Sequence, residues 1–180
     1  MKKTGLIVLL VLSAYFLQGC LVVEKMVFDV RLMSDTTGYA VVTAFNVSSD
    51  AVGNKEFDDD VALLADMNGG DGFLDYMREF GREVLERHLY IEDGKLNGSC
   101  KFTFKSVKNV ESIQYDGEYY YLRVNNENTR LGETNGTVIE KDGFKWVVWE
   151  KGARSLNFEF YNTSKAKTRD LVPAFKGILK

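Results

Sequence analysis

The 180-residue chain is poor in the residues on which most catalytic and metal sites depend. It has one histidine (His88), one proline (Pro173) and two cysteines (Cys20 and Cys100). A single histidine excludes a histidine-rich zinc site, and two cysteines leave too few thiolates for a structural zinc site. The single proline excludes a long proline-rich linker, and the length suits one domain with its own core.

The chain also lacks the short motifs that identify nucleotide-binding and hydrolytic enzymes. Neither G-x-x-x-x-G-K-[ST] nor G-x-G-x-x-G occurs, and no serine stands in a G-x-S-x-G elbow. Asp66, Asn68 and Asp71 offer oxygen ligands for calcium, but Met77 occupies the position where an EF-hand loop needs glutamate. We therefore predict no cofactor and no metal, and we assign no catalytic residue.

The amino terminus has the composition of a secretory signal. Lys2 and Lys3 supply a positive head, and the uncharged run that follows, residues 5–17, is shorter than the roughly 20 residues needed to span a bilayer. An uncut transmembrane anchor is the alternative. The run ends in LQGC, residues 17–20.

This ending resembles the lipobox of bacterial lipoproteins, with an aliphatic Leu17, a small Gly19 and Cys20; Gln18 departs slightly from the pattern. The resemblance implies that residues 1–19 are a signal peptide that is cut off. It also implies that the Cys20 thiol receives a diacylglycerol and the new amino terminus a fatty acyl chain such as palmitate. Two or three such chains hold a protein firmly on a membrane, because each buried methylene contributes about 0.8 kcal/mol.

Residues 20–25 are predicted to be the lipidated cysteine and a short tether, followed by a single domain over 26–180. A tether this short would keep the domain close to the membrane surface. Leu21 stands where an aspartate marks inner-membrane retention in many Gram-negative bacteria. The same resemblance therefore implies the periplasmic side of the outer membrane, if the host has one.

The charge and cysteine content of the mature chain restrict its partners. The signal peptide removes two lysines and no acid, which leaves 21 basic against 26 acidic side chains. This acidic balance argues against a nucleic-acid partner. With Cys20 lipidated, Cys100 is the only thiol, so no internal disulfide forms, and we expect Cys100 to be buried beside Phe102 and Phe104.

Periodicity in the first half of the domain predicts two strands and two helices. Val27–Leu32 and Gly38–Asn46 read as strands, and Asp58–Met67 reads as a short helix. Phe73–Leu89 is predicted to be the main amphipathic helix, with its apolar residues on one face. His88 would lie on that apolar face, either packed at the helix end or acting as a general base or buried pH sensor.

The second half is predicted to be strand-rich and to end in a short helix over Leu171–Lys180. The whole is an α+β fold: an antiparallel sheet with the main helix, and the C-terminal helix, packed on one face. We expect the C-terminal helix to dock on the sheet; the alternative is that it lies on the membrane. The expected strands are SCKFTFKSV (99–107), EYYYLRVN (118–125), GTVIE (136–140), FKWVVWE (144–150) and SLNFEFYN (155–162).

The strand, turn, strand and helix that follow the lipobox resemble LppM-type bacterial lipoproteins, by pattern alone and over the first half of the mature chain. Members of that family often end in a transmembrane helix, and this sequence shows no such segment. No functional residue is carried over from the family.

Aromatic residues concentrate in the later strands. Tyr119, Tyr121, Trp146 and Trp149 are our candidates for a groove that binds a lipid, glycan or peptide, although aromatic residues of strands also build cores. Our leading hypothesis is a non-catalytic envelope lipoprotein that binds a protein or lipid partner close to the membrane. The alternatives are an envelope hydrolase that uses two carboxylates, and a lipid carrier with an apolar cavity.

Overall fold

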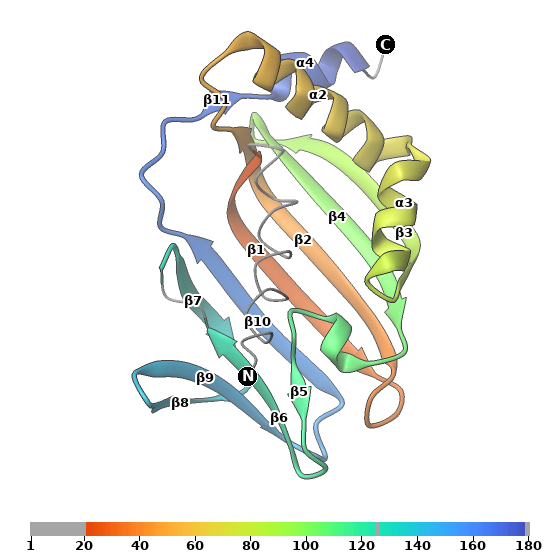
Figure 1. Ribbon diagram of the computed structural model, residues 1–180, viewed down its shortest axis with the longest axis vertical. Helices are drawn as coiled ribbons and strands as arrows, with labels where there is room; N and C mark the ends of the chain where they lie inside the picture. The colour runs from red at the N-terminus through yellow and green to blue at the C-terminus, as the bar shows by residue number, and fades with distance from the viewer. Residues whose placement is uncertain (1–20, 125–126, 179–180) are drawn as a thin grey trace, which may run out of the picture.

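The computed structural model describes residues 21–124 and 127–178, which form two antiparallel sheets and three α-helices (Figure 1). The predicted α+β class is confirmed. The helices are α2 (Asn54–Gly69), α3 (Asp71–Glu79) and α4 (Val172–Ile178).

The large sheet has seven strands in the order β3-β4-β2-β1-β10-β7, with β11 paired to the end of β2. The small sheet has the order β5-β6-β9-β8. The strands of the large sheet are β1 (Leu21–Leu32), β2 (Gly38–Ser49), β3 (Arg82–Glu92), β4 (Lys95–Phe104), β7 (Thr129–Thr134), β10 (Ser155–Asn162) and β11 (Arg169–Asp170). Those of the small sheet are β5 (Gln114–Tyr115), β6 (Tyr119–Val124), β8 (Thr137–Lys141) and β9 (Phe144–Glu150).

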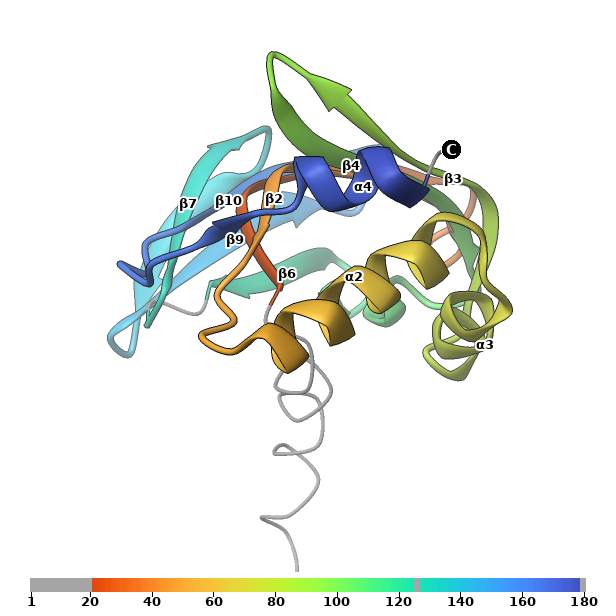
Figure 2. The same ribbon diagram turned by 90° about the horizontal axis from the view of Figure 1, so that it is seen from above.

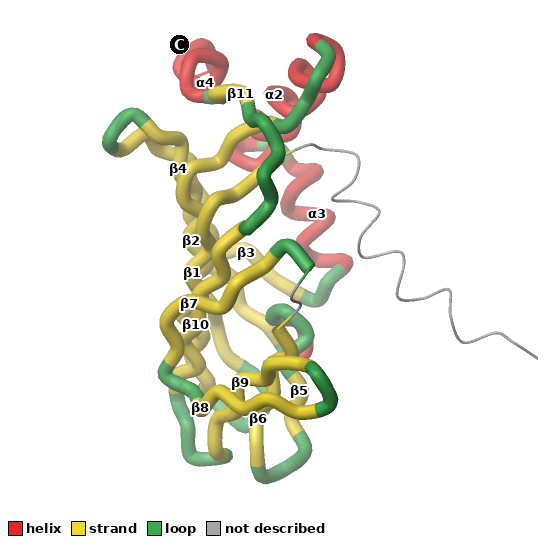
Figure 3. The backbone as a smooth tube through the Cα atoms, turned by 90° about the vertical axis from the view of Figure 1, so that its left-hand side faces the viewer, coloured by secondary structure: helices red, strands yellow, loops and turns green. Residues whose placement is uncertain are grey.

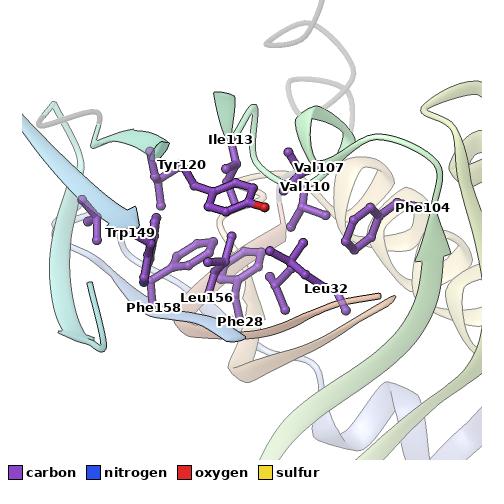
Figure 4. Close-up of a cluster of buried hydrophobic side chains, with 14 of the residues drawn as sticks. Phe28, Leu32, Phe104, Val107, Val110, Ile113, Tyr120, Trp149, Leu156 and Phe158 are labelled. Atoms are coloured by element: carbon purple, nitrogen blue, oxygen red, sulfur yellow. The ribbon is translucent and has the colours of Figure 1, made fainter. Parts of the chain in front are cut away.

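The main core lies between the two sheets, because α2, α3 and the small sheet lie on the same side of the large sheet (Figures 2 and 3). Alternation along β1 points Phe28 and Val30 inward and sends Asp29 to the opposite face. The ring of Phe28 stacks on that of Phe158, with centroids 4.5 Å apart. The small sheet contributes Tyr120 and Trp149 to the same cluster (Figure 4). Each fully buried large apolar side chain contributes about 1.5–3 kcal/mol to folding.

A second cluster closes the end of the large sheet where β1 begins. Leu171 and Phe175 of the α4 region are fully buried there, against Leu64 of α2 and Leu96 of β4. Pro173 is the second residue of α4, where its missing N–H costs little. The expected docking of the C-terminal helix is therefore found within residues 171–178, and it includes α2 as well as the sheet.

The predicted main helix over Phe73–Leu89 is wrong in its second half. The helix ends at Glu79, Gly81 adopts a φ of +69°, and residues from Arg82 onward form β3. A φ in this range is readily adopted only by glycine, which makes Gly81 a helix-ending residue. The side chain of Asn109 holds the turn by donating to the Phe80 carbonyl.

The predicted short tether also differs from the structure. Leu21 already pairs with Ser49, and Lys25 pairs with Phe45, so residues 21–25 belong to β1. Among the described residues, the sheet therefore already includes the residue that follows Cys20 in the sequence. Cys20 itself, like the predicted signal peptide 1–19, lies outside the described residues.

Candidate binding face of the small sheet

Three of the four aromatic candidates lie on the outer face of the small sheet. In an antiparallel sheet, residues paired in register share a face. Tyr121 pairs with Val148, and Arg123 pairs with Trp146, so alternation along β6 and β9 brings these four side chains to one side. Tyr119 joins them, with its ring centroid 6.2 Å from that of Tyr121.

Sequence reasoning missed two further members of this surface. Phe144 lies two residues before Trp146 on the same strand face, and the Arg123 guanidinium lies 3.6 Å from the centroid of its ring. The period-2 alternation of FKWVVWE was sufficient to find Phe144. We name Tyr119, Tyr121, Arg123, Phe144 and Trp146 together the aromatic face.

The aromatic face is partly open to solvent. Tyr119 exposes 40% and Phe144 38% of their surface, and Ile139 of the adjacent edge strand exposes 41%. Tyr121 and Trp146 are half-buried. Exposed aromatic side chains grouped in this way provide a surface for apolar contact and for ring stacking.

The fourth candidate, Trp149, is a core residue. It pairs with Tyr120 on the inner face of the small sheet and is only 4% exposed. Its indole Nε1 donates to Asn135 Oδ1 over 2.7 Å. Asn135 Oδ1 also accepts the amide of Asn157, so Trp149 ties the small sheet to β10 of the large one. Three residues separate Trp146 from Trp149, and an odd spacing on a strand puts two side chains on opposite faces.

An open groove of about 700 Å³ begins beside Tyr119 and Ile139. The turn between β9 and β10 forms another wall, through Gly152 and Arg154. Trp149 also lines the groove, although it is only 4% exposed, and Gly136 packs closely against its indole ring. The groove adjoins the aromatic face, because Tyr119 belongs to both.

Hydrogen bonds to Asp116 fix the turn at one end of this face. Asp116 Oδ1 accepts the backbone amides of Glu118 and Tyr119 over 2.9 Å each, and its other oxygen accepts the Tyr121 hydroxyl. The Tyr121 hydrogen bond, followed by the two amides, lowers the pKa of Asp116. The same bond raises the pKa of Tyr121 to about 12. Tyr121 therefore stays protonated at neutral pH and offers a partner its ring.

A second groove, of about 490 Å³, lies where β7 meets β10 and contains three carboxylates, Asp29, Glu133 and Glu159. Glu159 Oε1 lies 2.8 Å from Lys25 Nζ. Burial opposes ionisation of Glu159, but hydrogen bonds from Lys25, the Glu133 amide and Tyr161 outweigh it and lower the pKa. Asp29 is paired with Arg31 over 2.8 Å. At least two of the three carboxylates are thus neutralised by a neighbouring cation.

The remaining candidates for chemistry lie apart from these grooves. His88 is exposed on β3, with its ring 5.3 Å from that of Tyr90, so the predicted place on the apolar face of a helix is wrong. Cys100 points toward the main core beside Phe102 and Phe104, as expected, but it is only partly buried. Over residues 21–124 and 127–178, no three His, Cys, Asp or Glu side chains group closely enough to hold a metal ion.

Comparison with known proteins gives this chain no relative: no family model, no curated protein and no solved structure matches it. Within the part of the chain that the structure describes, no helix is long and apolar enough to cross a membrane.

Proposed function

We propose that the chain is a lipid-anchored bacterial envelope protein whose domain binds a partner protein without catalysis. The observation that carries the proposal is the aromatic face, a partly exposed group of two tyrosines, a phenylalanine, a tryptophan and an arginine. Tyr, Trp, Phe and Arg are the residues most enriched at protein interfaces, where a few of them supply most of the binding energy. The anchor rests on the resemblance of LQGC to a lipobox.

The edge of the small sheet supports a protein as the occupant. β8 is the outermost strand of that sheet, all five of its residues are exposed, and it pairs with β9 without a bulge. Val138 and Ile139 are large apolar residues on this unpaired edge. Such an edge offers free backbone donors and acceptors to an extended segment of another chain. A partner that contacts the aromatic face would lie next to β8.

The two alternatives have less support. A carboxylate hydrolase needs one acid with a raised pKa as its proton donor, whereas in the second groove the pKa of Glu159 is lowered and Asp29 is ion-paired. A lipid carrier needs an apolar cavity between the sheet and the elements that cover it. That space is occupied by the packed side chains of the main core, including Phe28, Tyr120 and Phe158.

Site-specific photo-crosslinking in living cells tests the proposed binding. A photoreactive phenylalanine analogue at Phe144 keeps an aromatic ring in place. The same analogue at Leu85 serves as the control, because Leu85 is 53% exposed and belongs to β3, an edge strand of the other sheet. We expect a discrete crosslinked species from position 144 only, which is lost on the second substitution Tyr119→Ala. Equal crosslinking from positions 144 and 85, or none from 144, would refute the proposal.

A further inference from the structure

The two ends of β1 mark two ends of the molecule. Leu21 pairs with Ser49, and Ser49 also pairs with Arg169 of β11, so the first residue of β1 lies beside the end of β2 and the start of the α4 region. At the other end, the turn after Leu32 contacts the small sheet, where the Tyr120 hydroxyl donates to the Asp35 carbonyl over 2.9 Å. Twelve residues of strand separate these ends, which corresponds to about 40 Å at about 3.3 Å per residue. We name them the Leu21 end and the small-sheet end (Figure 1).

The Leu21 end carries an exposed apolar tip. Val52, in the connection between β2 and α2, is 100% exposed, whereas its neighbour Ala51 is buried. The connection is fixed, since Arg169 Nη1 donates to the Gly53 carbonyl over 3.0 Å. A fully exposed valine held on a fixed loop is suited to insertion into an apolar phase, because burial of its side chain there is favourable.

A basic segment leads to the same end. Residues 163–169, TSKAKTR, contain Lys165, Lys167 and Arg169 and no acid, and the two lysines are exposed. The acids beside Val52 include half-buried Asp50 and exposed Glu56 and Asp58. Asp59 is paired with Lys55 over 2.8 Å, and Asp170 accepts the Val172 amide. Any attraction to anionic lipid at this end therefore has to come from the basic segment 163–169. Lysines near a membrane surface are attracted to anionic lipid headgroups.

We infer that the Leu21 end faces the bilayer, that Val52 enters its interfacial layer, and that Lys165 and Lys167 lie against anionic headgroups. The inference rests on the proposed lipid anchor at Cys20. One peptide bond joins Cys20 to Leu21, which is already paired in the sheet, so the anchor leaves the domain little freedom to turn away. The aromatic face then lies toward the far end of β1, a strand about 40 Å long, and is directed toward a partner in the aqueous space.

Depth-dependent fluorescence quenching tests this orientation on the full lipidated protein in phosphatidylethanolamine–phosphatidylglycerol vesicles. Starting from the variant Cys100→Ser, single cysteines are introduced as Val52→Cys and, in the control, Met33→Cys, and each is labelled with an environment-sensitive dye. Met33 is a matched site, since it is an apolar loop residue that is 75% exposed at the small-sheet end. We expect a blue shift and strong quenching by nitroxide-bearing lipid at position 52, and the unquenched spectrum of the water-exposed dye at position 33.

The outcomes separate this inference from the proposed function. Protein that floats with the vesicles but shows equal quenching at both positions, or quenching at 33 alone, would overturn the orientation and leave the anchor intact. Protein that fails to float and carries no lipid would overturn both. Vesicles without phosphatidylglycerol test the contact between the two lysines and anionic lipid. We expect less quenching at position 52 in these vesicles. Unchanged quenching would show that Lys165 and Lys167 do not contact anionic headgroups.

Discussion

Trp146 and Trp149 are three positions apart on β9 and have opposite surroundings. Trp149 is buried and hydrogen-bonded to Asn135, whereas Trp146 lies on the aromatic face and its buried Nε1 has no hydrogen-bond partner among the described residues. Both were candidates for binding in the sequence analysis, because composition gives the residue type but not the face of the sheet on which a side chain lies. Strand alternation distinguishes the two, once the strand is known to cover a core on one face only.

The two indoles should respond differently to the loss of their N–H. Trp149→Phe removes a buried hydrogen bond and leaves Asn135 Oδ1 with one donor fewer, so we expect it to lower the free energy of unfolding by about 1–3 kcal/mol. Trp146→Phe removes a donor that makes no bond, so it should change this free energy by less than about 1 kcal/mol. Urea denaturation followed by far-ultraviolet circular dichroism measures both. An equal loss in the two variants would contradict the assignment of Trp149 as the tie between the sheets.

Cys100 provides a test by pH. Burial, opposed by the charges of Arg82 and Arg87, raises the pKa of the Cys100 thiol to about 11. Only the thiolate reacts, so in the native protein the rate of alkylation should rise about tenfold per pH unit from 7 to 9 without levelling off. In denaturant the thiol returns to an ordinary pKa near 8.5, and the rate should be higher and begin to level off near that pH. Identical pH profiles in the two states would contradict the inward placement of Cys100.

At the scale of elements, the sequence predicted most strands and failed where two periodicities compete. The apolar residues from Phe73 onward fit a helix as far as Met77, and those from Val84 onward fit both a helix and a strand. Two local signals resolve the conflict: Gly81, which ends the helix, and Asp93-Gly94, whose positive φ values of 50° and 74° form the turn of the β3–β4 hairpin. An Asp-Gly pair between apolar runs is a strong hairpin signal. The Asp93-Gly94 pair therefore predicts a strand, β3, before the turn, and His88 then belongs to that strand and not to a helix.

Two other elements could not be read from local pattern. β7 contains Gly132 and pairs with β10 across a bulge between Phe158 and Phe160, so its alternation is broken. The first residues of β1 resemble a tether in isolation, and only their pairing with residues 45–49 of β2 makes them a strand. In both cases the deciding contacts are distant in the sequence, which is why composition and spacing did not reveal them.

The docking of α4 can be measured with a matched pair of variants. Phe175 is fully buried in the second cluster, whereas Ile178 lies one turn later and is 36% exposed. Phe175→Ala should lower the free energy of unfolding by about 3–5 kcal/mol, and Ile178→Ala should lower it by about 1 kcal/mol or less. Thermal unfolding of both variants provides the measurement. A small effect of Phe175→Ala would indicate that α4 leaves the sheet in solution, which is the membrane-bound alternative.

At the scale of the whole molecule, the fold separates the proposed attachment from the proposed binding. The large sheet runs from the Leu21 end to the small-sheet end, and each end has its own packed cluster. Lipid on Cys20 would act at the Leu21 end, beside the second cluster, and a partner on the aromatic face would act at the small-sheet end, beside the main core. The large sheet then serves as a rigid spacer, because four long neighbouring strands, β4, β2, β1 and β10, pair along most of its length.

The anchor is the premise on which this arrangement depends, and the two cysteines of the chain allow a controlled test. Cys20→Ser removes the sulfur that a diacylglycerol would modify, so the precursor should stay uncut and should incorporate no fatty-acid analogue. Cys100→Ser is the control: its thiol is partly buried on β4, and the variant should be cut and labelled as the original chain is. Metabolic labelling with an alkyne fatty acid and the mobility of the product in gels report both steps.

Normal cutting of Cys20→Ser with release of a soluble domain would contradict the lipobox interpretation. The domain would then be free to present either end to a partner, and only the crosslinking result at Phe144 would still define its function.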